Sequence, residues 1–297
     1  MNNTLALSKD LPGASNKATP HTLDKDQQLI VIPYCKIDNL SPAGSVSSSV
    51  NDMSKWVMML LQNGKVNGQQ VIPANAIYQT RVPQSILGNG GHPFNKMNFS
   101  LYGLGWDLND YNGKRLVSHT GGVNGFVTSV TLVPDEKLGI VVLTNSDQNG
   151  LYEAVKWEIL DAYLKLPYRN YAGLFLANNK QQLQNAKDTW KKKIDTVAMH
   201  KPAALPLNAF AGEYQHEVYG WIKITAATDH LTMTFQHHPN LVGTLEPLGG
   251  NRFVCTYSDP EFGRKVLNFS IDNGKVKSFI LRVADFVEFT TYEFFKK

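Results

Sequence analysis

A proline-containing segment at residues 201–206 divides this sequence into two parts with different patterns. Helical and strand-like patterns both precede it, whereas short alternating runs rich in Thr, Val, Phe and Tyr follow it. Because prolines restrict the backbone and interrupt regular structure, we place a domain boundary at this segment. The 297 residues exceed the usual size of a single domain, which agrees with a chain of two domains.

The second part is expected to be all β. Its strand-like runs are 221–225, 231–236, 252–257, 266–271, 276–281 and 286–294. Turn residues such as Asn273-Gly274 separate the runs as in hairpins. Six or more strands in about 90 residues, with no helix among them, indicate a small barrel or sandwich. The predicted fold is therefore α+β over residues 1–170, a helical linker over 171–206 and a small all-β barrel over 207–297.

The first part is expected to form an antiparallel sheet with helices. Its three strand-like runs are 115–119, 126–133 and 138–144. The short turns between these runs favour antiparallel pairing. One helix is predicted to begin after Ser49, the expected N-cap, and to end at Asn63-Gly64. Apolar spacing predicts a second helix over 151–166, and the Gly, Pro and Asn content of residues 82–98 predicts a long surface loop.

The sharpest chemical signal is Ser-His-Thr-Gly-Gly at residues 118–122, where the first strand-like run ends. Paired glycines beside a strand let a substrate carbonyl approach the backbone, and the N–H of Gly122 can then stabilise an oxyanion. His119 can donate a hydrogen bond to the carboxylate or leaving group of an acyl substrate. Taken alone, the same residues also fit a tight hairpin beside an exposed histidine.

Four stretches of the first part resemble the serine β-lactamase and penicillin-recognising family, of the class C, DD-peptidase and esterase type. They are Ser41–Trp56, Tyr102–Trp106, His119–Phe126 and Pro134–Asn145. The third catalytic motif of that family is Lys-Thr-Gly or His-Thr-Gly. The resemblance therefore implies that His119, Thr120 and Gly121 correspond to this motif. It implies substrate-binding positions at Thr120 and Gly121 and an oxyanion-hole N–H at Gly122. It also implies hydrolysis of an amide or ester through an acyl-serine, with β-lactams, D-Ala-D-Ala peptides or small esters as substrates.

Two earlier motifs of the family, Ser-x-x-Lys and Tyr-x-Asn, supply the nucleophile and its base. No serine of this chain has a lysine three residues later, and we expect both motifs to be missing. Ser49-Val50-Asn51 fits a related Ser-x-Asn pattern in its letters, but its position predicts a helix cap. We therefore expect a truncated catalytic domain that is inactive by itself. Its exposed sheet edge at 138–144 would be covered by an N-terminal segment or by a second copy of the chain.

The second part resembles the small lipocalin-like β domain often appended to such enzymes. The stretches that carry this resemblance include Ala211–Tyr214, Leu248–Phe253 and Asn273–Val276. The resemblance implies no chemistry for this domain. The alternative to a hydrolase fragment is therefore a non-catalytic binding or interaction module that uses the retained scaffold and the barrel.

Several other classes of function have no support in the sequence. A net charge of +4, with one cluster at Lys191–Lys193, does not make the basic stripe of a nucleic-acid-binding protein. The apolar runs are shorter than the ~20 residues of a membrane span. His216, His237 and His238 lack acidic or thiol neighbours at ligand spacing, so we predict no metal, and no nucleotide-binding motif predicts a cofactor. The chain shows no export signal, whereas the resemblance implies an intact bacterial protein exported to the periplasm or cell surface.

Overall fold

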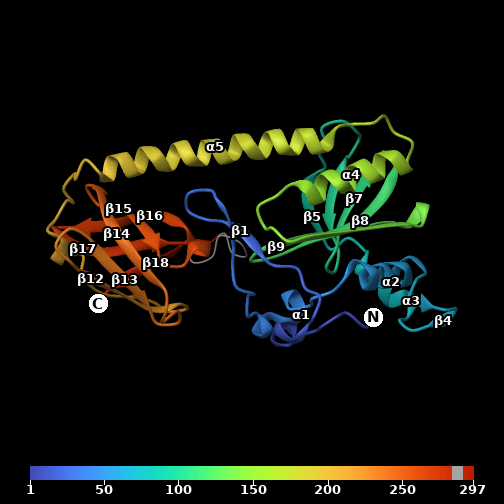
Figure 1. Cartoon of the computed structure of the whole chain (residues 1–297), viewed down its shortest axis with the longest axis horizontal. Helices are drawn as coiled ribbons and strands as arrows, with labels where there is room; N and C mark the ends of the chain where they lie inside the picture. Colours follow the sequence, from blue (N-terminus) through green and yellow to red (C-terminus); the bar gives the residue numbers. More distant parts are fainter. Residues whose placement is uncertain (283–289) are drawn as a thin grey trace. The chain divides into compact units, whose positions relative to one another are not determined.

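The computed structural model of the chain describes residues 1–282 and 290–297. The chain forms two compact units (Figure 1). The first unit contains residues 1–22 and 29–181, and the second contains residues 23–28 and 182–297.

The first unit is built on a six-stranded antiparallel sheet in the order β10-β9-β8-β7-β6-β5. The strands are β5 (Ser85–Asn89), β6 (Phe99–Tyr102), β7 (Asp107–Tyr111), β8 (Lys114–Val123), β9 (Phe126–Val133) and β10 (Leu138–Thr144). Strands β8, β9 and β10 correspond to the three predicted runs, and their antiparallel pairing is confirmed.

Residues 82–98 do not form the continuous surface loop that was predicted. Strand β5 lies within them and pairs with β6, with Ile86 opposite Leu101. All five residues of β5 are exposed, and Ile86 is 84% exposed. Because β5 buries neither face, its sequence lacks the alternation by which a half-buried strand is recognised.

Helices cover both faces of this sheet (Figure 1). Helix α2 (Val50–Leu61) packs on the face that carries Val117 and Leu132. Helix α4 (Leu151–Tyr163) packs on the opposite face, which carries the next residues along the same strands, Leu116 and Val133. Both helices were predicted. The two small cores hold β8 and β9 rigidly in the middle of the sheet.

The predicted caps of α2 are confirmed. The backbone N–H of Asp52 donates to Ser49 Oγ over 3.3 Å at the start of the helix. At the end of the helix, Asn63 and Gly64 have φ angles of +51° and +89°. A left-handed backbone at these two residues turns the chain away from the helix axis.

Shorter elements complete the first unit. They are η1 (Ser8–Gly13), β1 (His21–Leu23), β2 (Leu29–Val31), η2 (Asp38–Leu40), α1 (Ser41–Gly44), β3 (Lys65–Val66), β4 (Gln69–Gln70), α3 (Ala74–Thr80) and η3 (Pro134–Glu136). The last residue of β1, Leu23, is grouped with the second unit.

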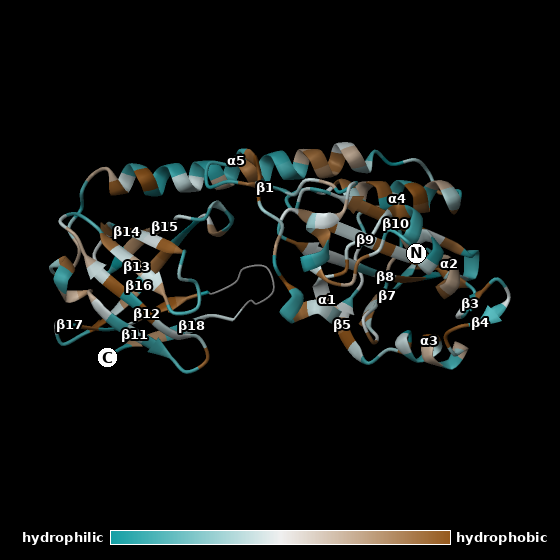
Figure 2. Cartoon of the chain, turned by 60° about the horizontal axis from the view of Figure 1, so that its bottom comes forward, coloured by the Kyte–Doolittle hydropathy of each residue, from teal (hydrophilic) through white to brown (hydrophobic). Residues whose placement is uncertain are grey.

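Helix α5 (Tyr171–Val197) occupies most of the predicted helical linker. Its residues up to Gln181 group with the first unit and the rest with the second. Hydrophilic and hydrophobic residues alternate along its ribbon in Figure 2. No helix in the part of the chain that the structure describes is both long enough and apolar enough to cross a membrane.

The second unit contains a closed antiparallel barrel of eight strands. The strands are β11 (Gly212–His216), β12 (Gly220–Ala226), β13 (Leu231–Phe235), β14 (Val242–Gly249), β15 (Arg252–Tyr257), β16 (Arg264–Asp272), β17 (Lys275–Leu281) and β18 (Tyr292–Lys296). Two short turns of helix, η4 (Leu207–Ala209) and η5 (Pro260–Phe262), accompany them. The all-β prediction is confirmed, although residues 286–289 of the last predicted run lie outside the described residues.

Strands β11 and β14 were not predicted. Only Tyr214 in β11 is fully buried, and the neighbouring residues are polar or glycine. Strand β14 contains Pro247, where its pairing with β15 becomes irregular before Gly249. Proline and glycine weaken a strand pattern, and for this reason β14 was not recognised from the residues alone.

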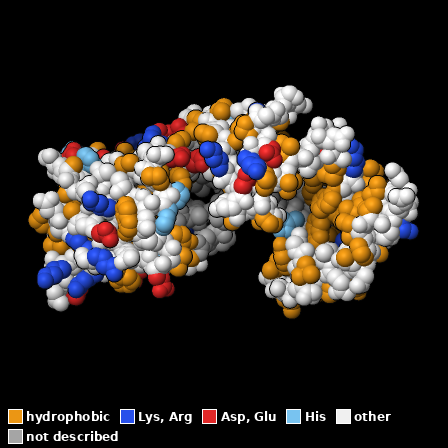
Figure 3. Space-filling model, turned by 90° about the horizontal axis from the view of Figure 1, so that it is seen from below, with side chains coloured by type: hydrophobic (Ala, Val, Ile, Leu, Met, Phe, Trp, Pro, Cys, Tyr) orange, Lys and Arg blue, Asp and Glu red, His pale blue; other side chains and the backbone are white. Residues whose placement is uncertain are grey.

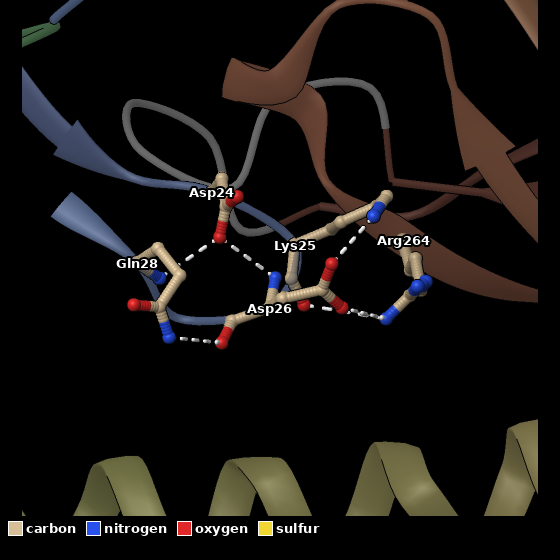
Figure 4. Close-up of polar contacts among 5 residues, drawn as sticks. All are labelled: Asp24, Lys25, Asp26, Gln28 and Arg264. Carbon is tan, nitrogen blue, oxygen red and sulfur yellow. Dashed lines mark hydrogen bonds and ion pairs between the residues drawn. The ribbon is translucent and has the colours of Figure 1, made fainter. Parts of the chain in front are cut away.

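The turn between β1 and β2 contacts the barrel, which explains why residues 23–28 group with the second unit (Figure 4). Arg264 Nη1 donates to Asp26 Oδ1 over 3.1 Å and to the carbonyl of Lys25 over 3.3 Å. Asp24 Oδ1 accepts the backbone N–H groups of Asp26 and Gln28, each over 2.8 Å. The Asp24 carboxylate thereby holds the turn in the shape that presents Asp26 to Arg264.

Candidate functional site

The predicted site residues lie on the part of β8 that extends beyond β7. Strand β7 pairs with β8 only from Lys114 to Ser118, whereas β9 pairs with β8 as far as Val123. Within the described strands, residues 119–123 therefore have a partner on one side only. A strand with an unpaired edge can accept an extended substrate through its backbone groups.

His119 is exposed on this edge and is held by two hydrogen bonds. Its Nε2 lies 2.9 Å from the hydroxyl of Tyr102, and its Nδ1 contacts the carbonyl oxygen of Thr120. Because a carbonyl only accepts, Nδ1 carries the hydrogen. In the neutral ring, Nε2 is then an acceptor and Tyr102 donates to it.

Tyr102 is a site residue that sequence reasoning did not identify. Tyr102 faces Asp107 on β7, and Asp107 faces Ser118 on β8, so the three residues form a row across three strands. Since β7 begins at Asp107, the tyrosine ring can reach past it to His119, with ring centroids 6.0 Å apart. The sequence contained Tyr102 within a family-like stretch, but only the register of β6 and β7 brings it to the site.

Asp107 is the second group that only the structure brings near His119. Burial raises the pKa of the Asp107 carboxyl, and attraction to a protonated His119 partly opposes that rise. Lys156 and Glu153 of α4 also act on Asp107, with opposite signs. The site therefore brings together an imidazole, a phenol and a carboxyl.

The other three predicted residues follow His119 directly. Thr120 and Gly121 are exposed and lie opposite Ser129 and Thr128, and Gly122 is partly buried opposite Val127. A Cβ atom at Gly121 would lie 3.0 Å from Thr128 Oγ1. A larger residue at position 121 would therefore push against β9.

The turn that follows is fixed by residues distant in sequence. Gly125 has a φ of +82°, and a Cβ there would lie 2.3 Å from the Cβ of Pro20. Its N–H donates to Asp147 Oδ2 over 2.8 Å, and its carbonyl accepts the N–H of His21 over 3.3 Å. Glycine is required here both by the left-handed backbone and by the close approach of residues 20–21.

The beginning of the described chain is tied to helix α2 through Asp52. This carboxylate accepts the N–H of Asn3 over 2.7 Å, the Thr4 hydroxyl over 3.1 Å and Lys55 Nζ over 2.9 Å. The hydrogen bond from Lys55, followed by that from Asn3, lowers the pKa of Asp52 to about 2. Residues 3–4 are thus anchored to α2 by an ionised, almost completely buried carboxylate.

The expectation that the chain contains no Tyr-x-Asn triplet is wrong. Tyr168-Arg169-Asn170 fits Tyr-x-Asn, but it lies in the connection between α4 and α5 rather than on β8. Tyr168 is 77% exposed, and Asn170 Oδ1 accepts the N–H of Gly173 over 2.8 Å at the start of α5. Asn170 is therefore a helix cap. Ser49, in the other apparent triplet, has the same capping role.

The predicted open edge of the sheet is present in the described strands, because β10 pairs only with β9. Hydrophobic side chains are also exposed on the first unit (Figure 3). Ile86, Phe99 and Leu87 at the other end of the sheet are 84%, 60% and 58% exposed. In residues 1–282 and 290–297, no three His, Cys, Asp or Glu side chains come together as a metal site.

Comparison with protein-family models assigns the class of the first unit. The Beta-lactamase family model matches residues 3–164, which is more than half of the chain, and the chain belongs to this family. A second model, "Domain of unknown function (DUF3471)", matches residues 198–296 and so includes the described barrel strands.

Two curated fungal proteins are similar to this chain. "Unguisins hydrolase ungD" of Aspergillus violaceofuscus is 26% identical over 275 residues, which cover 84% of this chain and 48% of that protein. "Unguisins hydrolase ungD'" of Aspergillus campestris is 25% identical over 203 residues, covering 65% of this chain and 36% of that protein. The chain thus spans about half, or less, of the length of these relatives.

Among solved structures, the octameric penicillin-binding protein homologue from Pyrococcus abyssi is 17% identical, with a TM-score of 0.46. That match covers 100% of this chain and 57% of the other. SurE is also 17% identical, with a TM-score of 0.36, over 90% of this chain and 56% of that one.

Proposed function

We propose that this chain supplies the substrate-binding strand of a serine hydrolase that cleaves amides or esters through an acyl-enzyme. The observation that carries the proposal is His119, hydrogen-bonded to Tyr102 at 2.9 Å on the half-paired part of β8, in a chain of the Beta-lactamase family. The proposed substrates are β-lactams, D-Ala-D-Ala peptides or small esters. The similarity to two proteins named as hydrolases supports the reaction type.

In this proposal, the substrate carbonyl lies against β8 at Gly121 and Gly122. Attack by a serine hydroxyl forms a carbon–oxygen bond, opens the carbonyl double bond, places negative charge on the carbonyl oxygen, and passes the hydroxyl proton to the base that accompanies the serine. The Gly122 N–H then stabilises that oxyanion, an effect of roughly 3–4 kcal/mol where such donors have been removed from other enzymes. His119, oriented by Tyr102, binds the substrate carboxylate or gives a proton to the leaving group when its ring is protonated on both nitrogens, so that Nε2 carries the hydrogen it donates.

The nucleophilic serine of the proposed enzyme lies on a segment outside residues 1–297. The support for this is that no serine in the chain is followed by lysine at the third position, the spacing that places an amine one helical turn from the hydroxyl. We further propose that this outside segment, or a second copy of the chain, pairs with the open edge of β10. By itself, the chain would bind substrate weakly and form no acyl-enzyme.

The test of the site is kinetic and uses the longer polypeptide that carries the nucleophile. Replacing His119 with alanine should lower kcat/KM for a chromogenic β-lactam or a p-nitrophenyl ester by roughly 100-fold or more. Tyr102→Phe should cause a smaller loss, because Nε2 of His119 loses its hydroxyl partner. His230→Ala, an exposed histidine of the barrel paired with Asp229, is the matched control and should be unchanged. Equal activity in His119→Ala and the control would contradict the proposal.

A further inference from the structure

The interior of the barrel is packed at one end and hollow at the other. At the end where β11 begins, Phe210, Phe253 and Phe269 are at most 1% exposed, with ring centroids 4.9–5.3 Å apart. At the opposite end, a cavity of about 100 Å³ opens among the described residues. Because neighbouring strands are antiparallel, the β11–β12, β13–β14 and β15–β16 connections all lie at this hollow end.

Phe, Tyr and Trp side chains form half of the described cavity wall. They are Tyr219, Trp221, Phe235, Tyr257, Phe262 and Phe294. The rings of Tyr257 and Phe262 lie 5.8 Å apart, and those of Tyr257 and Phe235 lie 6.2 Å apart. None of the described residues that line the cavity is Asp, Glu, Lys or Arg. The wall therefore suits an uncharged apolar group and disfavours an ion.

The polar rim is held in place by β12. Gln236 Oε1 accepts the backbone N–H of Trp221 over 2.9 Å. This contact depends on Gly220, where a Cβ atom would lie only 2.1 Å from Gln236 Oε1. Since Oε1 is engaged with Trp221, any hydrogen bond from Gln236 to a ligand uses its N–H donors. His237 and His238 stand beside it on the same rim.

The rim and the wall together define the ligand. A donor beside an uncharged apolar cavity fits a carbonyl oxygen next to an apolar side chain, which is the arrangement within a peptide. Because an engineered cavity of about 150 Å³ holds benzene, a cavity of about 100 Å³ suits a branched four-carbon side chain better than a ring. We propose that this end of the barrel binds one leucine-sized side chain of a peptide together with its neighbouring carbonyl group.

A fatty acid is a poorer occupant on two grounds. Its chain is longer than a cavity of about 100 Å³ can enclose, and its carboxylate would meet no lysine or arginine in the described lining. The proposed site belongs to the barrel alone and does not depend on the hydrolase site on β8. Its success or failure is therefore separate from the hydrolase proposal.

The test is an NMR titration of the full chain with ¹⁵N-labelled tryptophan. The chain has five tryptophans, and only Trp221 lines the cavity. N-acetyl-leucinamide should shift the indole signal of Trp221, assigned with a Trp221→Phe variant, and should leave the other four signals in place. N-acetyl-alaninamide should bind roughly 10- to 50-fold more weakly, because it buries three fewer carbon atoms. N-acetyl-lysinamide and octanoate should cause no shift at the same concentrations.

Two variants separate binding in the cavity from binding elsewhere. Leu241→Phe places a ring in the cavity and should weaken N-acetyl-leucinamide at least tenfold. Ile280→Phe, which adds the same ring at a residue that is 49% exposed, is its control and should bind normally. Phe235→Leu enlarges the cavity and should shift the preference toward N-acetyl-phenylalaninamide, which keeps the test valid if Leu241→Phe does not fold. Equal shifts with the leucine, alanine and lysine amides, or with octanoate, would overturn the proposal.

Discussion

Two glycines with nearly the same backbone offer a quantitative test of how the site hairpin is held. Gly125, in the β8–β9 turn, and Gly113, in the β7–β8 turn, have φ angles of +82° and +81°. An added Cβ at Gly113 meets nothing within 4 Å, whereas at Gly125 it lies 2.3 Å from Pro20 Cβ and 2.9 Å from Pro20 Cα. The two glycine-to-alanine variants thus share the backbone strain and differ in the contact with Pro20.

The expected losses follow from these two effects. A left-handed backbone costs a residue with a Cβ about 1–2 kcal/mol, so Gly113→Ala should lower the free energy of unfolding by that amount. Gly125→Ala adds overpacking against Pro20, typically about 1–3 kcal/mol, for a total of roughly 2–5 kcal/mol. The difference between the variants measures how firmly residues 20–21 pack on the turn beside Gly122.

The assay is native-state hydrogen exchange read by mass spectrometry on peptides from residues 107–144. This region reports on the first unit alone, which matters because a chain of two units need not unfold in one step. Peptides from 212–257 in the barrel should exchange as in the unmodified chain. Equal destabilisation by the two substitutions would show that Pro20 does not restrain the β8–β9 turn.

Two further outcomes are expected. The pKa of Asp52 is about 2 in the folded chain, below the ordinary value near 3.9, so its contribution to stability is complete above pH 5 and is lost as the pH falls toward 2. Acid titrations should therefore show less loss of stability between pH 5 and pH 2 in Asp52→Asn than in the unmodified chain, and parallel curves would contradict this. Burial raises the pKa of the Cys255 thiol to about 12, so iodoacetamide at pH 8 should alkylate the partly exposed Cys35 and spare Cys255 until the chain is denatured.

The parts of the fold that the sequence predicted are those whose signals are local. The α2 helix was predictable because Ser49 marks its start and Asn63-Gly64 marks its end. The spacing of its apolar residues marks its buried face. Strands β8, β9 and β10 were visible because they are apolar and separated by short turns. Strands β5 and β14 were missed for local reasons too, since one has no buried face and the other contains proline and glycine.

The candidate site was only partly predictable for a different reason. Because residues 119–122 are consecutive, the sequence alone shows that they lie together. Tyr102 and Asp107 reach His119 through the pairing of β6, β7 and β8, and strand register depends on the whole sheet. The barrel cavity likewise combines residues from five strands and three connections, which no spacing along the chain reveals.

We have proposed that this chain carries the substrate-binding strand of an acyl-serine hydrolase whose nucleophile lies elsewhere. The most direct test is fluorophosphonate labelling, followed by intact mass and peptide mapping. It would be applied to residues 1–297 and to the polypeptide recovered from its native cell. We expect no adduct on residues 1–297, and one adduct on a serine ahead of Met1 in a native polypeptide heavier than 33.1 kDa. A stoichiometric adduct on any serine within residues 1–297 would contradict it.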